Sequence, residues 1–80
     1  ELPREGKIFI VNCGYGSVCY LLAKCSENRE IFGFDDDNQK LEIMRNVGAM
    51  PENVIVTDSD DTDGFDVVVD GMSLEVLRIK

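Results

Sequence analysis

KIFIVNCGYGSVCYLLAKCSENREIFGFD, residues 7–35, is the stretch that decides the fold. It opens with the apolar run 8–11, which lacks the polar alternation of a half-exposed strand. Such runs are typical of parallel strands that are covered on both faces. Gly14 and Gly16 follow directly and indicate a turn at the end of this strand. Residues 7–12 are therefore predicted to form a buried strand that runs into a glycine turn.

A helix and a second strand are expected in the rest of the stretch. Ser17 is a suitable N-cap, and Asn28 is a plausible stop because Asn tolerates the left-handed conformation. The apolar residues between them recur at helical spacing and predict one buried face: Val18, Leu21, Leu22 and Cys25. Residues 31–34 read as a short second strand that ends at Asp35. The stretch therefore predicts a βαβ unit.

A second helix is predicted over residues 38–47. Asp36, Asp37 and Asn38 supply helix-start chemistry, and acids suit the positive end of the helix dipole. Its apolar residues fall on one broad side: Leu41, Ile43, Met44 and Val47. Gly48 stands where a helix C′ glycine is expected, and Pro51 prevents continuation.

Two further strands follow this helix. Residues 54–57 predict a third strand, residues 58–64 an acidic loop, and residues 65–70 a fourth strand with a continuous apolar centre. Residues 74–80 fit either a helix or a strand. Right-handed crossovers make a parallel sheet of order 3-2-1-4 the economical arrangement. We therefore expect a small three-layer α/β domain of Rossmann type, with its ligand position at the carboxyl ends of strands one and four.

Size and charge narrow the class of protein. Eighty residues make a single small domain, and a start at Glu1 suggests a piece cut from a larger protein. The formal charge of −8 argues against nucleic acid or an anionic membrane as the main partner. No apolar run is long enough to span a bilayer. We therefore expect a protein partner or self-association through the fourth strand or the segment after it, since a truncated sheet leaves an edge.

Cysteine and histidine content narrows the chemistry. The three cysteines are an odd number and read as reduced thiols of an intracellular protein, either cytoplasmic or nuclear. The chain has no histidine, the commonest general base and zinc ligand. Cys13 has no Cys-x-x-Cys partner, which favours a core or turn cysteine, and the acidic loop fails the calcium-loop pattern. No metal site is expected.

The motif CGYGS, residues 13–17, together with the acid Asp35, resembles the cofactor loop of class I S-adenosylmethionine-dependent methyltransferases. FDVVVDG, residues 65–71, is similar to the fourth-strand motif of that family. The resemblance implies that Gly14 and Gly16 let the backbone approach the methionine part of the cofactor. Tyr15, between them, is counted with the cofactor-binding residues, and its side chain either projects to solvent as a contact residue or folds back onto the sheet. The resemblance also implies that Asp35 binds the ribose hydroxyls and that Asp58 lies near the adenine.

The chain departs from that family at two positions. Asn12 stands at the first glycine of the pattern, and Ile10 stands where the first strand of the family carries an acid. Gly14 and Gly16 therefore either bind a ligand or only serve a tight turn, and the turn is favoured. Asp35 either accepts hydrogen bonds from ribose or solvates a loop and caps a helix, and the second role is favoured.

Two other families of Rossmann fold resemble parts of the chain. Medium-chain zinc-type dehydrogenases are similar over residues 21–24, 41–49 and 65–71, which implies NAD as cofactor with Asp35 favouring it over NADP. Potassium-channel regulatory domains are similar over residues 13–18. Each alignment loses at least one glycine of the expected motif.

Three functions follow from these patterns. The first is a degenerate methyltransferase-like domain that acts as a structural or protein-interaction module of a larger protein. The second is the S-adenosylmethionine-binding part of a methyltransferase, and the third is an NAD-binding half-domain of a dehydrogenase. The eroded glycine loop favours the first, a domain without catalysis of its own, and no catalytic residue is assigned.

Overall fold

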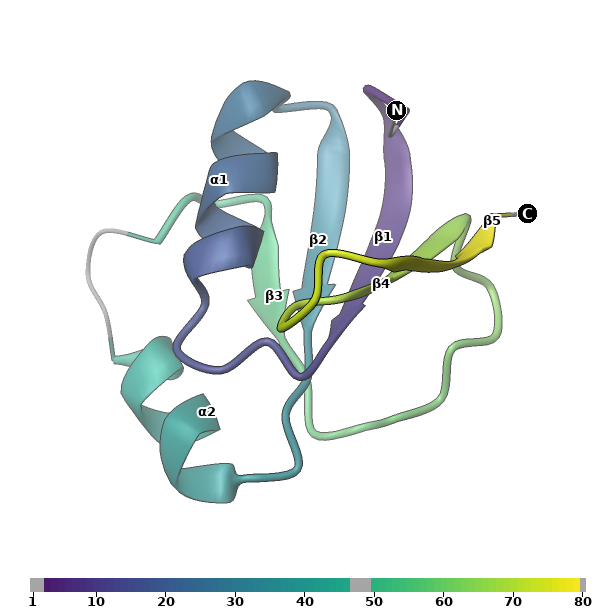
Figure 1. Ribbon diagram of the computed structural model, residues 1–80. Helices are drawn as coiled ribbons and strands as arrows, with labels where there is room; N and C mark the ends of the chain where they lie inside the picture. The colour runs from purple at the N-terminus through teal and green to yellow at the C-terminus, as the bar shows by residue number, and fades with distance from the viewer. Residues whose placement is uncertain (1–2, 47–49, 80) are drawn as a thin grey trace.

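The computed structural model describes residues 3–46 and 50–79. Within those ranges the elements in chain order are β1 (Gly6–Val11), α1 (Ser17–Cys25), β2 (Arg29–Gly33), α2 (Asn38–Arg45), β3 (Val54–Val56), β4 (Val67–Asp70) and β5 (Val76–Ile79). The strands form one sheet in the order β3-β2-β1-β4-β5 (Figure 1). The predicted α/β class and the order 3-2-1-4 are confirmed, and β5 extends the sheet by one strand.

The strand β1 occupies the centre of the sheet. It pairs in parallel with β2 on one side and β4 on the other, with Ile8 opposite both Ile31 and Val67. Ile8, Phe9 and Ile10 are almost fully buried, as a strand covered on both faces requires. Residues 74–80 fit either a helix or a strand in the sequence. The described part of this segment contains β5, which pairs antiparallel with β4.

Both helices cover the same face of the sheet, over β2 and β3 (Figure 1). The core on this face contains the alternate strand residues Ile8, Ile10, Ile31, Val67 and Val69. Gly33 allows the helices to come close, because a Cβ there would lie 3.0 Å from both Cys19 Sγ of α1 and Met44 Cε of α2. The half of this face over β4 and β5 has no helix among the described residues.

The opposite face of the sheet carries aromatic rings rather than helices. Phe65, in the loop before β4, packs edge-on against Phe9 and Phe32, with ring centroids 5.0 and 4.9 Å apart. Arg78 of β5 fixes this loop by donating from its guanidinium to the carbonyls of Thr62 and Phe65. The expected third layer is wrong for the described residues: residues 57–66 connect β3 to β4 as a loop, where a three-layer fold has a helix.

Helix α1 differs from its prediction in its start and in its buried face. Gly16, not Ser17, is the N-cap, at a left-handed φ of 95° that favours glycine. The buried residues are Cys19 and Ala23, flanked by Val18 and Leu22, whereas Leu21 and Cys25 are exposed. The helix lies so close to Gly33 that small side chains fill the contact, and the larger Leu21 stays outside.

Helix α2 begins as predicted. Asp37 is its N-cap, and its carboxylate accepts a hydrogen bond of 3.0 Å from the amide of Gln39. Leu41 and Met44 are buried as expected, but Ile43 is half exposed. The expected end of the helix at Val47 and Gly48 lies outside the described residues.

Candidate functional site

The glycine turn lies between β1 and α1 at the carboxyl ends of the parallel strands. Its backbone is held by three hydrogen bonds: Cys13 N to Phe34 O at 3.0 Å, Gly16 N to Cys13 O at 3.0 Å, and Gly14 N to an Asp35 carboxylate oxygen at 2.9 Å. The amides of Gly14 and Gly16, which a ligand of this turn would use, therefore have partners within the protein.

Asp35 joins the glycine turn to the start of α2. One carboxylate oxygen accepts from the Gly14 amide and the other from the Asp37 amide, both at 2.9 Å, and the residue is 6% exposed. The Asp37 amide, the Gly14 amide and the charge of Lys40 together lower the pKa of Asp35, and burial acts against them. The site therefore holds an ionised carboxylate, and each of its oxygens already accepts one backbone hydrogen bond.

Methionine side chains cover Gly16. A Cβ on Gly16 would lie 2.8 Å from Met50 Cε and 3.0 Å from Met44 Cε. The buried position of Met44 follows from the helical pattern of α2, but the pattern does not reveal that its thioether reaches the glycine turn. A side chain larger than glycine at this position would therefore meet the two methionines.

The other two predicted site residues lie at opposite ends of α2. Tyr15 is 56% exposed, with Lys40 Nζ from the first turn of α2 at 5.8 Å from its ring centroid. Asp58 follows β3 and accepts from Arg45 in the last turn of α2. The structure thus brings Gly14, Gly16 and Asp35 together, and no hydrogen bond among the described residues joins Asp58 to them.

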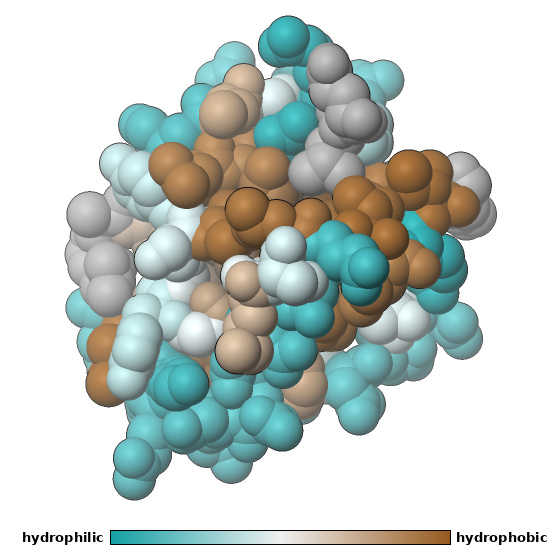
Figure 2. Space-filling view, in the orientation of Figure 1, coloured by the Kyte–Doolittle hydropathy of each residue, from teal (hydrophilic) through white to brown (hydrophobic). Residues whose placement is uncertain are grey.

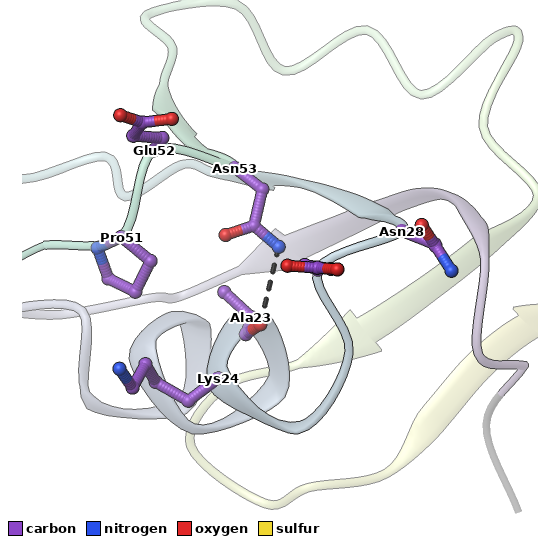
Figure 3. A pocket seen from close by; sticks show the side chains of 7 residues that line it. Ala23, Lys24, Asn28, Pro51, Glu52 and Asn53 are labelled. Atoms are coloured by element: carbon purple, nitrogen blue, oxygen red, sulfur yellow. Dashed lines mark hydrogen bonds between the residues drawn. The ribbon is translucent and has the colours of Figure 1, made fainter.

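Three surface pockets lie near the amino ends of the parallel strands, away from the glycine turn. The first, about 510 Å³, lies between the end of α1 and the segment before β3, where Ala23 and Asn53 meet (Figure 3). The second, about 780 Å³, includes Gly6 and Ile79, and the third, about 260 Å³, includes Asp63 and Ile79. None of these three is lined by Gly14, Gly16 or Asp35.

Two polar residues near the amino ends of the strands, Asn53 and Arg29, were not predicted from the sequence. The Asn53 amide donates to the carbonyls of Ala23, Ser26 and Arg29 at 3.3, 3.2 and 3.0 Å (the bond to Ala23 is drawn in Figure 3). Arg29 is 7% exposed and donates to the carbonyls of Pro3 and Leu22. Nothing in their sequence context distinguishes them from loop residues. Both hold backbone carbonyls and have structural roles.

An apolar surface strip follows β5 and the turn before it. We call this the β5 strip, and its members are Met72, Leu74, Val76, Leu77 and Ile79, which are 40–82% exposed. Figure 2 shows it as part of a brown band across the visible face. Val76 and Ile79 pair with Val69 and Val67, whose side chains belong to the helix-covered core. The strip is exposed because α1 and α2 cover the β2–β3 half of this face.

Comparisons with models of known protein families and with curated proteins find no match to this chain. Neither α1 nor α2, the helices of the described residues, is long and apolar enough to cross a membrane. The fold defines the class of this protein: it is a small Rossmann-like α/β domain with a mixed five-stranded sheet.

Proposed function

We propose that this domain is a protein-interaction module on a degenerate methyltransferase-like Rossmann fold, and that it binds an extended, basic segment of another protein along β5. The observation that carries the proposal is the β5 strip on the outermost strand of the sheet. The outer edge of such a strand offers unpaired amides and carbonyls for one more strand.

The backbone of the strip supports a role in binding. Leu74 adopts a left-handed φ of 64°, a conformation that costs a non-glycine residue about 1 kcal/mol or more. Its side chain is nevertheless 65% exposed, so its own packing does not repay this strain. A contact with a partner would give the exposed Leu74 a function.

Charge selects the kind of partner. Acidic residues border the end of β5: Asp63 shares one pocket with Ile79, and Glu5 and Asp66 share the other. The whole chain carries a formal charge of −8. A segment that alternates apolar residues with Lys or Arg would match both the strip and these acids, whereas a second copy would bring like charges together.

The glycine turn supports the degenerate part of the proposal. The Gly14 and Gly16 amides are engaged within the protein, and the Asp35 carboxylate accepts from the amides of Gly14 and Asp37. Met44 and Met50 crowd Gly16. Binding S-adenosylmethionine at this turn is the second candidate function. It is favoured by the position of Asp35 beside the turn, at the carboxyl ends of the strands.

The test measures binding of ten-residue peptides of alternating Val and Lys by fluorescence anisotropy. The Val–Lys peptide is expected to bind, with affinity that falls as salt screens the charges, and a Val–Glu peptide is expected not to bind. Leu77→Lys should abolish binding, and Leu21→Lys, a matched change of an exposed leucine on α1, should leave it intact. Equal binding by both variants would contradict the proposed surface.

A separate titration addresses the second candidate function. Calorimetry with S-adenosylmethionine is expected to show no heat up to millimolar concentration. Micromolar binding that is lost in Asp35→Asn would instead identify a working cofactor domain, whatever the peptides do at β5.

A further inference from the structure

Three sulfur atoms from three separate elements converge beside Gly33. Cys13 follows β1 at the glycine turn, Cys19 lies in the first turn of α1, and Met44 lies near the end of α2. The Cys13 thiol donates to the Met44 thioether, with Sγ and Sδ 3.8 Å apart. All three residues are buried, with exposures of 5%, 0% and 1%.

Gly33 lies beside the thiols of both Cys13 and Cys19. A Cβ on Gly33 would lie 3.3 Å from Cys13 Sγ and 3.0 Å from Cys19 Sγ, so both thiols border the same point. The proximity of the two thiols lowers the pKa of Cys13 and raises that of Cys19, and burial also raises the pKa of Cys19. The cluster is therefore a contiguous group of soft donors rather than three unrelated core residues.

We propose that Cys13, Cys19 and Met44 form a binding site for copper(I), with two thiolates and one thioether as ligands. Soft sulfur ligands select soft ions, and copper(I) accepts thiolate and thioether together. Binding would release the two thiol protons to solvent and leave two copper–thiolate bonds. No oxidation or reduction is involved when the metal is supplied as copper(I).

One sulfur pair of the cluster, Cys13 and Met44, has the separation of two ligands on one metal ion. Metal–sulfur bonds of about 2.3 Å place two ligand sulfurs about 3.8 to 4.0 Å apart in tetrahedral or trigonal geometry. Cys13 and Met44 already have this separation. Zinc fits poorly, because structural zinc sites use four nitrogen, oxygen or thiolate ligands, and the chain has no histidine.

The surroundings of the cluster act on the protons of its thiols and on access to it. Cys19 lies in the first turn of α1, at the positive end of the helix dipole, but burial and the neighbouring Cys13 raise its pKa, so copper(I) would have to displace its proton. The charge of the Asp35 carboxylate acts against the lowered pKa of Cys13. A Cβ on Gly14, the neighbour of Cys13, would meet no other atom within 4 Å, so the glycine turn borders open space beside Cys13.

The experiment is an anaerobic titration of the purified protein with copper(I) held by a colorimetric chelator. The wild type is expected to withdraw one equivalent. X-ray absorption of the complex should show sulfur neighbours only. Because the ion would join three elements of the fold, copper(I) should also raise the midpoint of thermal unfolding.

Single substitutions identify the ligands. Cys13→Ser and Cys19→Ser should each lose the bound copper, and Met44→Leu, a change of similar volume, should weaken it by about tenfold or more. Cys25→Ser is the matched control, because Cys25 is an exposed cysteine at the end of α1. Circular dichroism of the metal-free proteins shows which variants are folded.

Three results would overturn the proposal. They are a folded wild type that takes no copper from the chelator, a folded Cys13→Ser variant that still binds one equivalent, and loss of copper in Cys25→Ser. The first would leave the three sulfurs as core packing, in which buried cysteines behave as small apolar residues.

Discussion

The carboxylate of Asp35 ties the glycine turn to the start of α2 through the amides of Gly14 and Asp37. Both bonds favour the ionised form, which is why the pKa of Asp35 is lowered. A group with a lowered folded pKa stabilises the protein fully above its unfolded pKa of about 3.9, and this contribution is lost as the pH falls through the folded pKa. Asp35 therefore contributes to acid unfolding.

Asp35→Asn is expected to lower the free energy of unfolding at pH 7 by about 1–3 kcal/mol, because an amide nitrogen replaces one acceptor of a backbone amide. The variant should also lose less stability than the wild type below about pH 5. Urea unfolding at several pH values measures both effects. Asp60→Asn removes the same charge from an exposed loop and serves as the control; an unchanged acid dependence in Asp35→Asn would contradict this role.

Leu74 stores backbone strain that can be released. Leu74→Gly is expected to raise the free energy of unfolding by about 0.5 to 1 kcal/mol, because glycine adopts its φ of 64° without steric cost. The same change should weaken binding of the Val–Lys peptide. Leu77→Gly, at a position of β5 without a left-handed φ, is expected to destabilise by about 0.5 to 1 kcal/mol, and urea unfolding that shows the same sign for both would refute the assignment.

At the scale of elements, Asn53 joins α1, β2 and β3. Its amide donates to three carbonyls, one from α1, one from the following turn and one from β2. Asn53→Ala is expected to cost about 1–3 kcal/mol. Asn53→Asp should cost more at pH 7, because it directs a carboxylate at three carbonyl oxygens.

Thermal unfolding of the two Asn53 variants measures this order. Asn28→Asp is the matched control, because Asn28 lines the same pocket but is exposed, and its effect should stay within about 0.5 kcal/mol. If Asn53→Ala is less stable than Asn53→Asp, the hydrogen bonds of the amide are not the source of the stability.

The strands were predictable because their apolar runs are unambiguous. The run from Ile8 to Val11 requires cover on both faces, which favours a central parallel strand, and right-handed crossovers then set the order 3-2-1-4. The buried face of α1 was not predictable, because the close approach at Gly33 selects Cys19 and Ala23 over larger residues. The absence of a third layer among the described residues was not predictable for a related reason. The acidic residues 58–64 indicate a loop, but they do not indicate which face of the sheet the loop crosses.

The candidate site was predictable in position but not in detail. Gly14, Gly16 and Asp35 meet at the carboxyl ends of β1 and β2, where their order in the chain placed them. The thioether of Met44 at this turn and the carbonyls held by Asn53 depend on contacts between distant segments. No local pattern specifies such contacts.

For the whole molecule, net charge opposes self-association. Two copies that met along the β5 strip would each carry a formal charge of −8. Sedimentation velocity is expected to show a monomer at about 0.05 M salt and association that increases toward about 1 M. At the higher concentration salt screens the charge repulsion, so the β5 strips of two copies can come into contact. Leu77→Lys should remain monomeric at both concentrations, and salt-dependent association of that variant would place the contact elsewhere.

The central position of β1 has a consequence for synthesis. This strand emerges first, yet one of its two edges is completed only by β4, about 60 residues later. At ribosomal rates of 5–20 residues per second, that edge waits roughly 3 to 12 seconds for its partner. During this interval the nascent chain presents the apolar run 8–11 with one open edge, which makes it the segment of the domain most exposed to aggregation.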